Sequence, residues 1–179
     1  MRLDAVRGPG LVGWRAMLLA LALSTAAATT GAQAQAGAPP VQGPWLGTWK
    51  LNLEKSTYQS GKPPAGTVRT YAMTATGPDT FDIVIRSTSP EGVQTMHMET
   101  RGARFDGKDY QEVGNPFADA NRFRITGERT YEFVESRNGA VVITITAEIS
   151  ADGKTRTSRQ QGRRPDGTTT LNVAVWDRQ

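Results

Sequence analysis

Glycine-containing turn signals recur at an almost constant interval along this chain, and no other feature restricts its possible folds so strongly. Two sets of three glycines are spaced 15 and 14 residues apart: Gly77, Gly92 and Gly107, and Gly139, Gly153 and Gly167. The second set lies in Asn-Gly and Asp-Gly pairs, which favour β-hairpins because the tight turn requires positive φ. Each interval leaves roughly ten residues for a strand, about 33 Å at the usual rise per residue. The spacing therefore predicts consecutive long hairpins of equal length.

The segments between these turns alternate apolar and polar residues with the period of two that is typical of strands. The alternation is clear in residues 49–53, 81–86, 141–149 and 170–175. One apolar and one mostly polar face indicate an antiparallel sheet with one face in water. Closing an up-and-down sheet on itself removes its edges. We therefore predict an all-β fold, an antiparallel up-and-down meander closed into a barrel of about 8–10 strands, with a two-sheet sandwich as the alternative.

The first 36 residues have the features of a secretory signal peptide. Three arginines precede or flank an apolar run at 16–28, and Ala34-Gln35-Ala36 provides a small-residue cleavage site. The run is shorter than the about 20 residues of a membrane helix. We expect cleavage after Ala36, a Pro/Gly linker over 37–45 and a single barrel domain over 46–179, with no transmembrane segment after cleavage. The protein is then exported, to a bacterial periplasm or to the outside of the cell.

Composition excludes several classes of site. The absence of cysteine excludes a disulfide framework, a thiolate metal site and a cysteine nucleophile, and a single histidine excludes a site with two imidazoles. Removing the leader takes away three arginines and one aspartate, so 18 basic and 16 acidic residues remain and the formal charge falls from +4 to +2. This balance gives no electrostatic argument for nucleic-acid binding. We expect no nucleic-acid partner, no metal and no cofactor.

One predicted strand departs from the alternation. From Lys154 to Arg164 neither face carries a large apolar residue, although the segments on both sides are the most apolar in the chain. If both flanking Asp-Gly pairs form two-residue loops, one set of residues shares the interior face: Arg156, Ser158 and Gln160, with Ile145, Val173 and Val175. If they form three-residue loops with a glycine bulge, the alternate set does: Thr155, Thr157, Arg159 and Gln161. In either register a polar strip with one arginine faces apolar neighbours.

Such a strip has two interpretations. In the first, it lines a partly wet internal cavity, where Arg156 or Arg159 binds an acidic head group and apolar walls hold the rest of the ligand. In the second, the strand curls away near the barrel mouth and its arginine pairs with Asp177 or Glu148. A dry, unpaired arginine in the interior would be too costly in free energy.

The remaining candidate residues have structural explanations. Met96 and Met98 share a face opposite to His97, and serve either as core residues or as an adaptable cavity wall. The Asp106-Gly107 pair is explained by the preference of Asp-Gly sequences for hairpin turns. Three glutamates interleaved with arginines are typical of a solvated strand face: Glu128, Glu132 and Glu135. No nucleophile elbow, P-loop or zinc-protease motif is present, and we expect no enzymatic activity.

Short motifs carry a resemblance to known proteins. Gly47-Thr48-Trp49 resembles the G-x-W motif that opens the first strand of lipocalins. Four segments together resemble a large group of uncharacterised secreted bacterial proteins described as lipocalin-like, or calycin-type: 46–52, Lys55-Ser56, Gly114-Asn115-Pro116 and 172–177. The resemblance covers residues 46–179. It implies a lipocalin-like barrel in which Trp49 plugs one end, and the group has no established activity to transfer.

The resemblance also bears on the register. In that group the positions that match Arg156 and Ser158 are usually apolar, which favours the register that places these two residues inside. Because this chain departs from the group there, its cavity is expected to be unusually polar.

These observations lead to three hypotheses. The first is an exported, non-catalytic barrel that binds a small apolar or amphipathic ligand, with an acidic head group as one form of that ligand. Its candidate binding residues are Arg156, Arg159, Ser158, Gln160, Met96, Met98, Ile145, Val173 and Val175. The second is a filled barrel that acts as an envelope interaction module or protein inhibitor through loops 114–121 and 163–167, with Arg163 and Arg164 contacting an anionic envelope component. The third, a hydrolase or isomerase, requires a buried carboxylate with a raised pKa.

Overall fold

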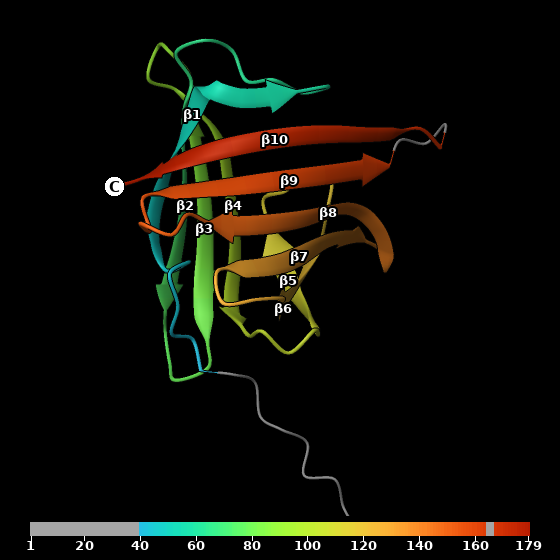
Figure 1. The fold of residues 1–179 in the computed structure, drawn as a ribbon. Helices are drawn as coiled ribbons and strands as arrows, with labels where there is room; N and C mark the ends of the chain where they lie inside the picture. Colours follow the sequence, from blue (N-terminus) through green and yellow to red (C-terminus); the bar gives the residue numbers. More distant parts are fainter. Residues whose placement is uncertain (1–39, 164–166) are drawn as a thin grey trace, which may run out of the picture. The chain divides into compact units, whose positions relative to one another are not determined.

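The structure, a computed structural model, describes residues 40–163 and 167–179, so the predicted signal peptide lies outside the described residues. It contains ten strands: β1 (Gly47–Tyr58), β2 (Val68–Ala75), β3 (Phe81–Thr88), β4 (Gln94–Ala103), β5 (Asp109–Val113), β6 (Ala120–Ile125), β7 (Thr130–Arg137), β8 (Ala140–Ile149), β9 (Thr155–Arg163) and β10 (Thr169–Arg178). Each strand pairs with the next in the sequence, and β1 pairs with β10. The predicted closed up-and-down barrel is confirmed, and the sandwich alternative is wrong (Figure 1).

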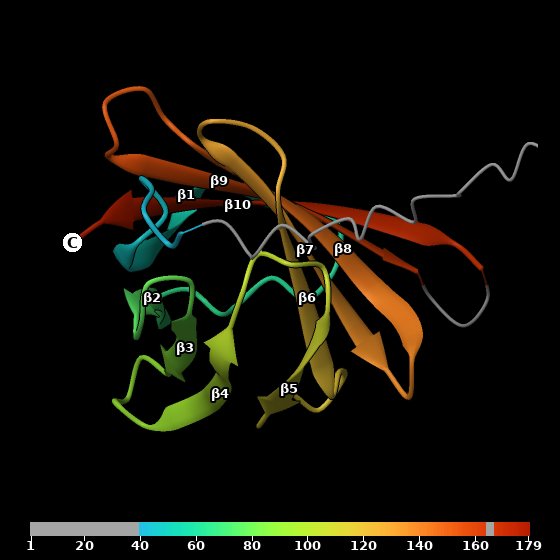
Figure 2. The same cartoon turned by 90° about the horizontal axis from the view of Figure 1, so that it is seen from below.

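Strands β2–β4 and strands β8–β10 run in crossing directions, and Figure 2 shows the two groups on different sides of the barrel. The ladder is narrowest at β5, which pairs with β4 through Val113 and Glu112 alone. The loop after β5, residues 114–119, lies at this weak part of the barrel wall. No helix among the residues that the structure describes is long and apolar enough to cross a membrane.

The Asn-Gly turn forms as its sequence predicts. Asn138 and Gly139 connect β7 directly to β8, and their φ angles are 50° and 77°. Two consecutive residues of positive φ define the turn whose twist matches that of the flanking strands. Local chemistry alone therefore sets this hairpin.

The Asp152-Gly153 turn sets the register between β8 and β9. Ile149 pairs with Arg156 and Ala147 pairs with Ser158, as two-residue loop geometry at this turn predicts. Arg156 and Ser158 therefore point to the interior of the barrel, where they are 1% and 0% exposed.

The register between β9 and β10 differs by one residue from that prediction. Thr169 pairs with Arg163, which leaves an odd number of residues, 164–168, in the connection. A one-residue shift moves every side chain of a strand to the opposite face. Trp176, opposite Arg156, consequently faces the interior, whereas the expected interior valines of β10 do not.

The predicted linker is partly wrong. Val41 and Trp45 are both 3% exposed, and the Trp45 ring packs edge-on against Phe105 with 5.5 Å between ring centroids. The Trp49 indole donates a hydrogen bond to the Trp45 carbonyl at 3.1 Å. The described part of this stretch therefore belongs to the barrel core, because its apolar side chains cover the end where β1 begins.

Aromatic side chains fill the interior at that end of the barrel: Trp45, Trp49, Phe81, Phe105, Phe123 and Tyr131. Trp49 is fully buried, and the Arg178 guanidinium lies 4.2 Å from its ring centroid. Arg178 also donates hydrogen bonds to the carbonyls of Leu46, Pro44 and Gly153. Arg178 therefore links the segment before β1 to the last strand and covers the aromatic end of the barrel.

Candidate functional site

The other half of the barrel interior holds a cavity of about 150 Å³. Ile85, Met96, Met98 and Phe133 form its apolar walls, and the exposed ring of Phe117 lies at its rim. The cavity is therefore neither the fully filled interior of one hypothesis nor the large chamber of a long-chain lipid carrier. Its volume lies below the range of typical drug-sized sites and is comparable to an engineered cavity that accepts benzene.

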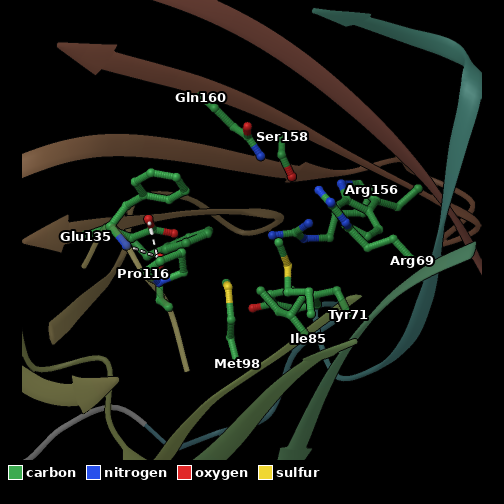
Figure 3. A pocket seen from close by; sticks show the side chains of 14 residues that line it. Arg69, Tyr71, Ile85, Met98, Pro116, Glu135, Arg156, Ser158 and Gln160 are labelled. Carbon is green, nitrogen blue, oxygen red and sulfur yellow. Dashed lines mark hydrogen bonds between the residues drawn. The ribbon is translucent and has the colours of Figure 1, made fainter. Parts of the chain in front are cut away.

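Arg156 lines this cavity (Figure 3) and also contacts the aromatic cluster through Tyr131. Its Nε donates a hydrogen bond to the Tyr131 hydroxyl at 3.0 Å, and its guanidinium lies 4.1 Å from the Tyr71 ring centroid and 5.6 Å from that of Trp176. The two tyrosine hydroxyls are 3.2 Å apart. Burial raises the pKa of Tyr71 well above its ordinary value, so its hydroxyl stays protonated. Aromatic faces, not an anion, thus surround the cation.

No ion pair within the described residues includes Arg156. Asp177, one of its expected partners, instead pairs with Lys55 at 3.3 Å and accepts a hydrogen bond from Asn52 at 2.7 Å. Ser158 Oγ and Trp176 Nε1 also have no hydrogen-bond partner within the part of the chain that the structure describes. Within the described residues the buried Arg156 guanidinium therefore has a neutral acceptor, the Tyr131 hydroxyl, but no anionic partner. Two further cavity-lining residues, Ser158 and Trp176, carry buried donors that have no acceptor there.

The structure separates the predicted binding residues into three groups. Five line the cavity: Arg156, Ser158, Gln160, Met96 and Met98. Ile145 is buried on the inner face, between its paired neighbours Phe133 and Gln160, and contributes to the core.

The other three predicted residues lie on the outer face, and their assignment to the interior is wrong. Arg159 pairs with Val173, and Val175 pairs with Thr157, on the side of the sheet opposite to Arg156 and Ser158. For Arg159 the reason is simple alternation along β9, and for the valines it is the one-residue shift of β10. Arg163 is exposed at the end of β9 and Arg164 lies outside the described residues, so the envelope contact stays a prediction.

Sequence reasoning missed two charged cavity residues. Arg69 on β2 lines the cavity, and burial lowers its pKa. Glu135 on β7 is 8% exposed and also lines the cavity, so its assignment to a solvated face is wrong. The signal was present in the period-two pattern, because Glu135 continues the inward face that Tyr131 and Phe133 begin.

Glu135 has a second carboxyl group beside it. The Asn115 side-chain amide donates to Glu112 Oε2 at 3.0 Å and to Glu135 Oε2 at 3.4 Å. Burial, followed by the charge of Glu112, raises the pKa of Glu135 to about 7. Burial raises the pKa of Glu112 as well. This is the buried carboxyl that the catalytic hypothesis required, although the described residues contain no group of three or more His, Cys, Asp or Glu placed to hold a metal.

The raised pKa of Glu135 predicts that the protein loses stability as the pH rises. The folded state retains this proton up to a pKa of about 7, whereas the unfolded chain releases it near 4.5. The contribution of Glu135 to the free energy of unfolding is fully present below the pKa of the unfolded chain. It is lost as the pH rises through the pKa of the folded state, and the loss has an upper bound of about 3 kcal/mol. Urea denaturation at about pH 5 and about pH 8 should show this loss in the wild type and a smaller one in Glu135→Gln, where only the raised pKa of Glu112 remains. An equal loss of stability in Glu135→Gln would show that other groups cause the pH dependence. Glu132→Gln, on the outer face of the same strand, is the control and should behave like the wild type.

Gly114 positions the loop that carries Asn115. Gly114 and Gly92 both have φ of 84°, but a Cβ at Gly114 would overlap the His97 carbonyl oxygen, whereas a Cβ at Gly92 would meet nothing within 4 Å. We expect Gly92→Ala to cost about 1 kcal/mol of unfolding free energy, from its backbone conformation alone. Gly114→Ala should cost about 3 kcal/mol or more, because the loop must also move. Equal losses in urea denaturation would show that the contact with His97 is not restrictive.

A closed antiparallel up-and-down barrel with one filled end and one polar cavity is a calycin-like architecture. Among solved structures, a variant of the fluorescent protein UnaG is similar, with a TM-score of 0.52 and 14% identity over 76% of this chain and 96% of that one. Rv2717c from M. tuberculosis gives a TM-score of 0.48 at 14% identity, covering 76% of this chain and 93% of its own. The first similarity supports the calycin-like barrel fold. No protein-family model and no curated protein matches the sequence.

Proposed function

We propose that this protein is a non-catalytic barrel that binds a small amphipathic molecule through an acidic head group. The observation that carries the proposal is a set of cavity-lining donors without an anionic partner. The buried Arg156 guanidinium donates only to a neutral hydroxyl, that of Tyr131, and the donors of Ser158 and Trp176 have no acceptor within the described residues. A carboxylate has two oxygens that can accept from all three groups, and charge-assisted hydrogen bonds of this kind are strong. The ligand would supply the anion that the chain does not.

The apolar walls of the cavity determine which chemical groups the rest of the ligand can carry. Met96, Met98, Ile85 and Phe133 offer apolar contact over a short distance, and methionine adapts to ligands of different shape. A volume of about 150 Å³ matches one ring or a short chain. We propose a small aromatic or short aliphatic acid.

The proposal includes export. Its support is the leader composition of residues 1–36, with arginines, an apolar run and a small-residue cleavage site. Expression of the full chain in a bacterial host, followed by fractionation, would test it. A shortened chain beginning at Gly37 in the periplasm or medium is expected, and a full-length chain retained in the cytoplasm would overturn this part.

Native mass spectrometry tests binding directly. The protein would be purified from the bacterial host and then mixed with a panel of small carboxylic acids and with their isosteric amides. We expect adducts of one-ring acids and none of the corresponding amides. Equal binding of acids and amides, or no adduct with any acid, would overturn the proposal and favour a barrel that acts through its outer loops.

A further inference from the structure

The polar groups of the cavity are segregated by type. One side holds hydrogen-bond donors without an anionic partner within the described residues: the Arg156 guanidinium, which donates to the Tyr131 hydroxyl, and the unpartnered donors of Ser158 and Trp176. The opposite side holds the carboxyl group of Glu135, which shares the side-chain amide of Asn115 with the neighbouring Glu112. Figure 3 shows Arg156 and Glu135 on opposite sides of the cavity.

A second, small cavity of about 10 Å³ lies next to Glu135. It shares Glu135 with the main cavity and is also lined by Glu112 and Asn121. Asn121 is 3% exposed, its amide nitrogen donates to Thr100 Oγ1 at 2.8 Å, and its Oδ1 has no donor within residues 40–163 and 167–179. This unpartnered acceptor beside two carboxyl groups marks a place for a donor.

The two polar ends do not neutralise each other. No described ion pair joins Glu135 to Arg156 or Arg69. On β7, Glu135 lies four residues beyond Tyr131, the contact of the Arg156 guanidinium, or about 13 Å along the strand. The apolar walls lie between these ends. Within the described residues, therefore, neither Arg156 nor an ionised Glu135 has a counter-ion from the chain itself.

We propose that the ligand is bipolar, with a carboxylate at one end that binds Arg156 and an amine at the other that donates to the Glu135–Glu112 pair. This rests on the proposed function and narrows its ligand class from small acids to small amino acids whose two charged groups are separated by an apolar spacer. The ammonium group supplies three donors, of which one binds Glu135 where it lines the main cavity, and the Asn115 amide links Glu135 to the second carboxyl group, Glu112. Glu135 thereby determines specificity.

A matched pair of probes tests this. Para-(aminomethyl)benzoate carries a carboxylate and an ammonium group at opposite ends of one ring, and para-ethylbenzoate is its isostere without the amine. Titration would follow the fluorescence of Trp176, which lines the cavity. At about pH 8, where Glu135 is mostly ionised, we expect the amine-bearing probe to bind the wild type about tenfold more tightly than its isostere.

Two variants on the same strand separate specificity from folding. Glu135→Gln should reduce the preference from about tenfold to about equal, and Glu112→Gln provides the same test if that variant does not fold. Glu132→Gln, on the outer face of β7, should keep the preference. Equal binding of both probes to the wild type, or a preference that survives in Glu135→Gln, would overturn the bipolar ligand and leave acid binding intact. Failure of both probes to bind would overturn the proposed function itself.

Discussion

Arg156→Met is expected to weaken carboxylate binding strongly while leaving the ligand-free barrel as stable as the wild type or more stable. Arg156 is buried without a described carboxylate partner, and replacing a buried charge by an apolar side chain of similar size is often neutral or stabilising. The lost contacts with Tyr71 and Trp176 offset part of this gain. The Tyr71 and Tyr131 hydroxyls remain partners of each other. We expect a change in unfolding free energy between zero and an increase of about 2 kcal/mol.

The affinity for a small carboxylate should fall about 100-fold in the same variant, as is usual when one partner of a buried charged pair is removed. Arg159→Met is the matched control, since Arg159 lies three residues along the same strand on the outer face. It should change neither quantity. Stability would be measured by urea denaturation without ligand, and affinity by titration. A stability loss of about 2 kcal/mol or more in Arg156→Met would assign this arginine a structural role, and an unchanged affinity would remove it from the site.

Trp49→Ala is expected to cause the largest loss of stability in the molecule. Its side chain is fully buried, donates to the Trp45 carbonyl and lies under the Arg178 guanidinium. Truncating a buried tryptophan usually costs about 3–5 kcal/mol, through lost burial and the cavity left behind. That is a large part of the about 5–15 kcal/mol that stabilises a typical domain. The end cap formed by Val41 and Trp45 would lose its support.

Phe117→Ala is the control for Trp49→Ala, because it also truncates an aromatic ring but one that is 72% exposed. Urea denaturation followed by circular dichroism should show a change within about 0.5 kcal/mol for Phe117→Ala. Should Trp49→Ala not fold, Trp49→Phe retains a ring and should show a smaller loss. Similar midpoints for Trp49→Ala and Phe117→Ala would show that Trp49 is not essential to the sealed end.

The cavity illustrates which site residues a sequence pattern can reveal. Arg156 and Ser158 were predictable because a polar segment lies between two apolar ones and a short turn sets its register. Glu135 was misassigned because charge alternation along β7 resembles a solvated face, although its parity with Phe133 places it inside. Arg69 had no distinguishing local signal. Its role depends on the curvature that brings β2 opposite β9.

The amino-acid sequence by itself determined the strands, their order and the barrel, because evenly spaced turn residues and period-two alternation act locally and leave one simple way to pair neighbours. The tertiary structure alone decided which residues meet inside. The pairing of β9 with β10 depends on the whole closed sheet, and a shift of one residue exchanged Val173 and Val175 for Trp176 on the inner face. Closure also placed Arg156 and Glu135 in one cavity, since residues distant in the sequence become neighbours only when the barrel curves around them.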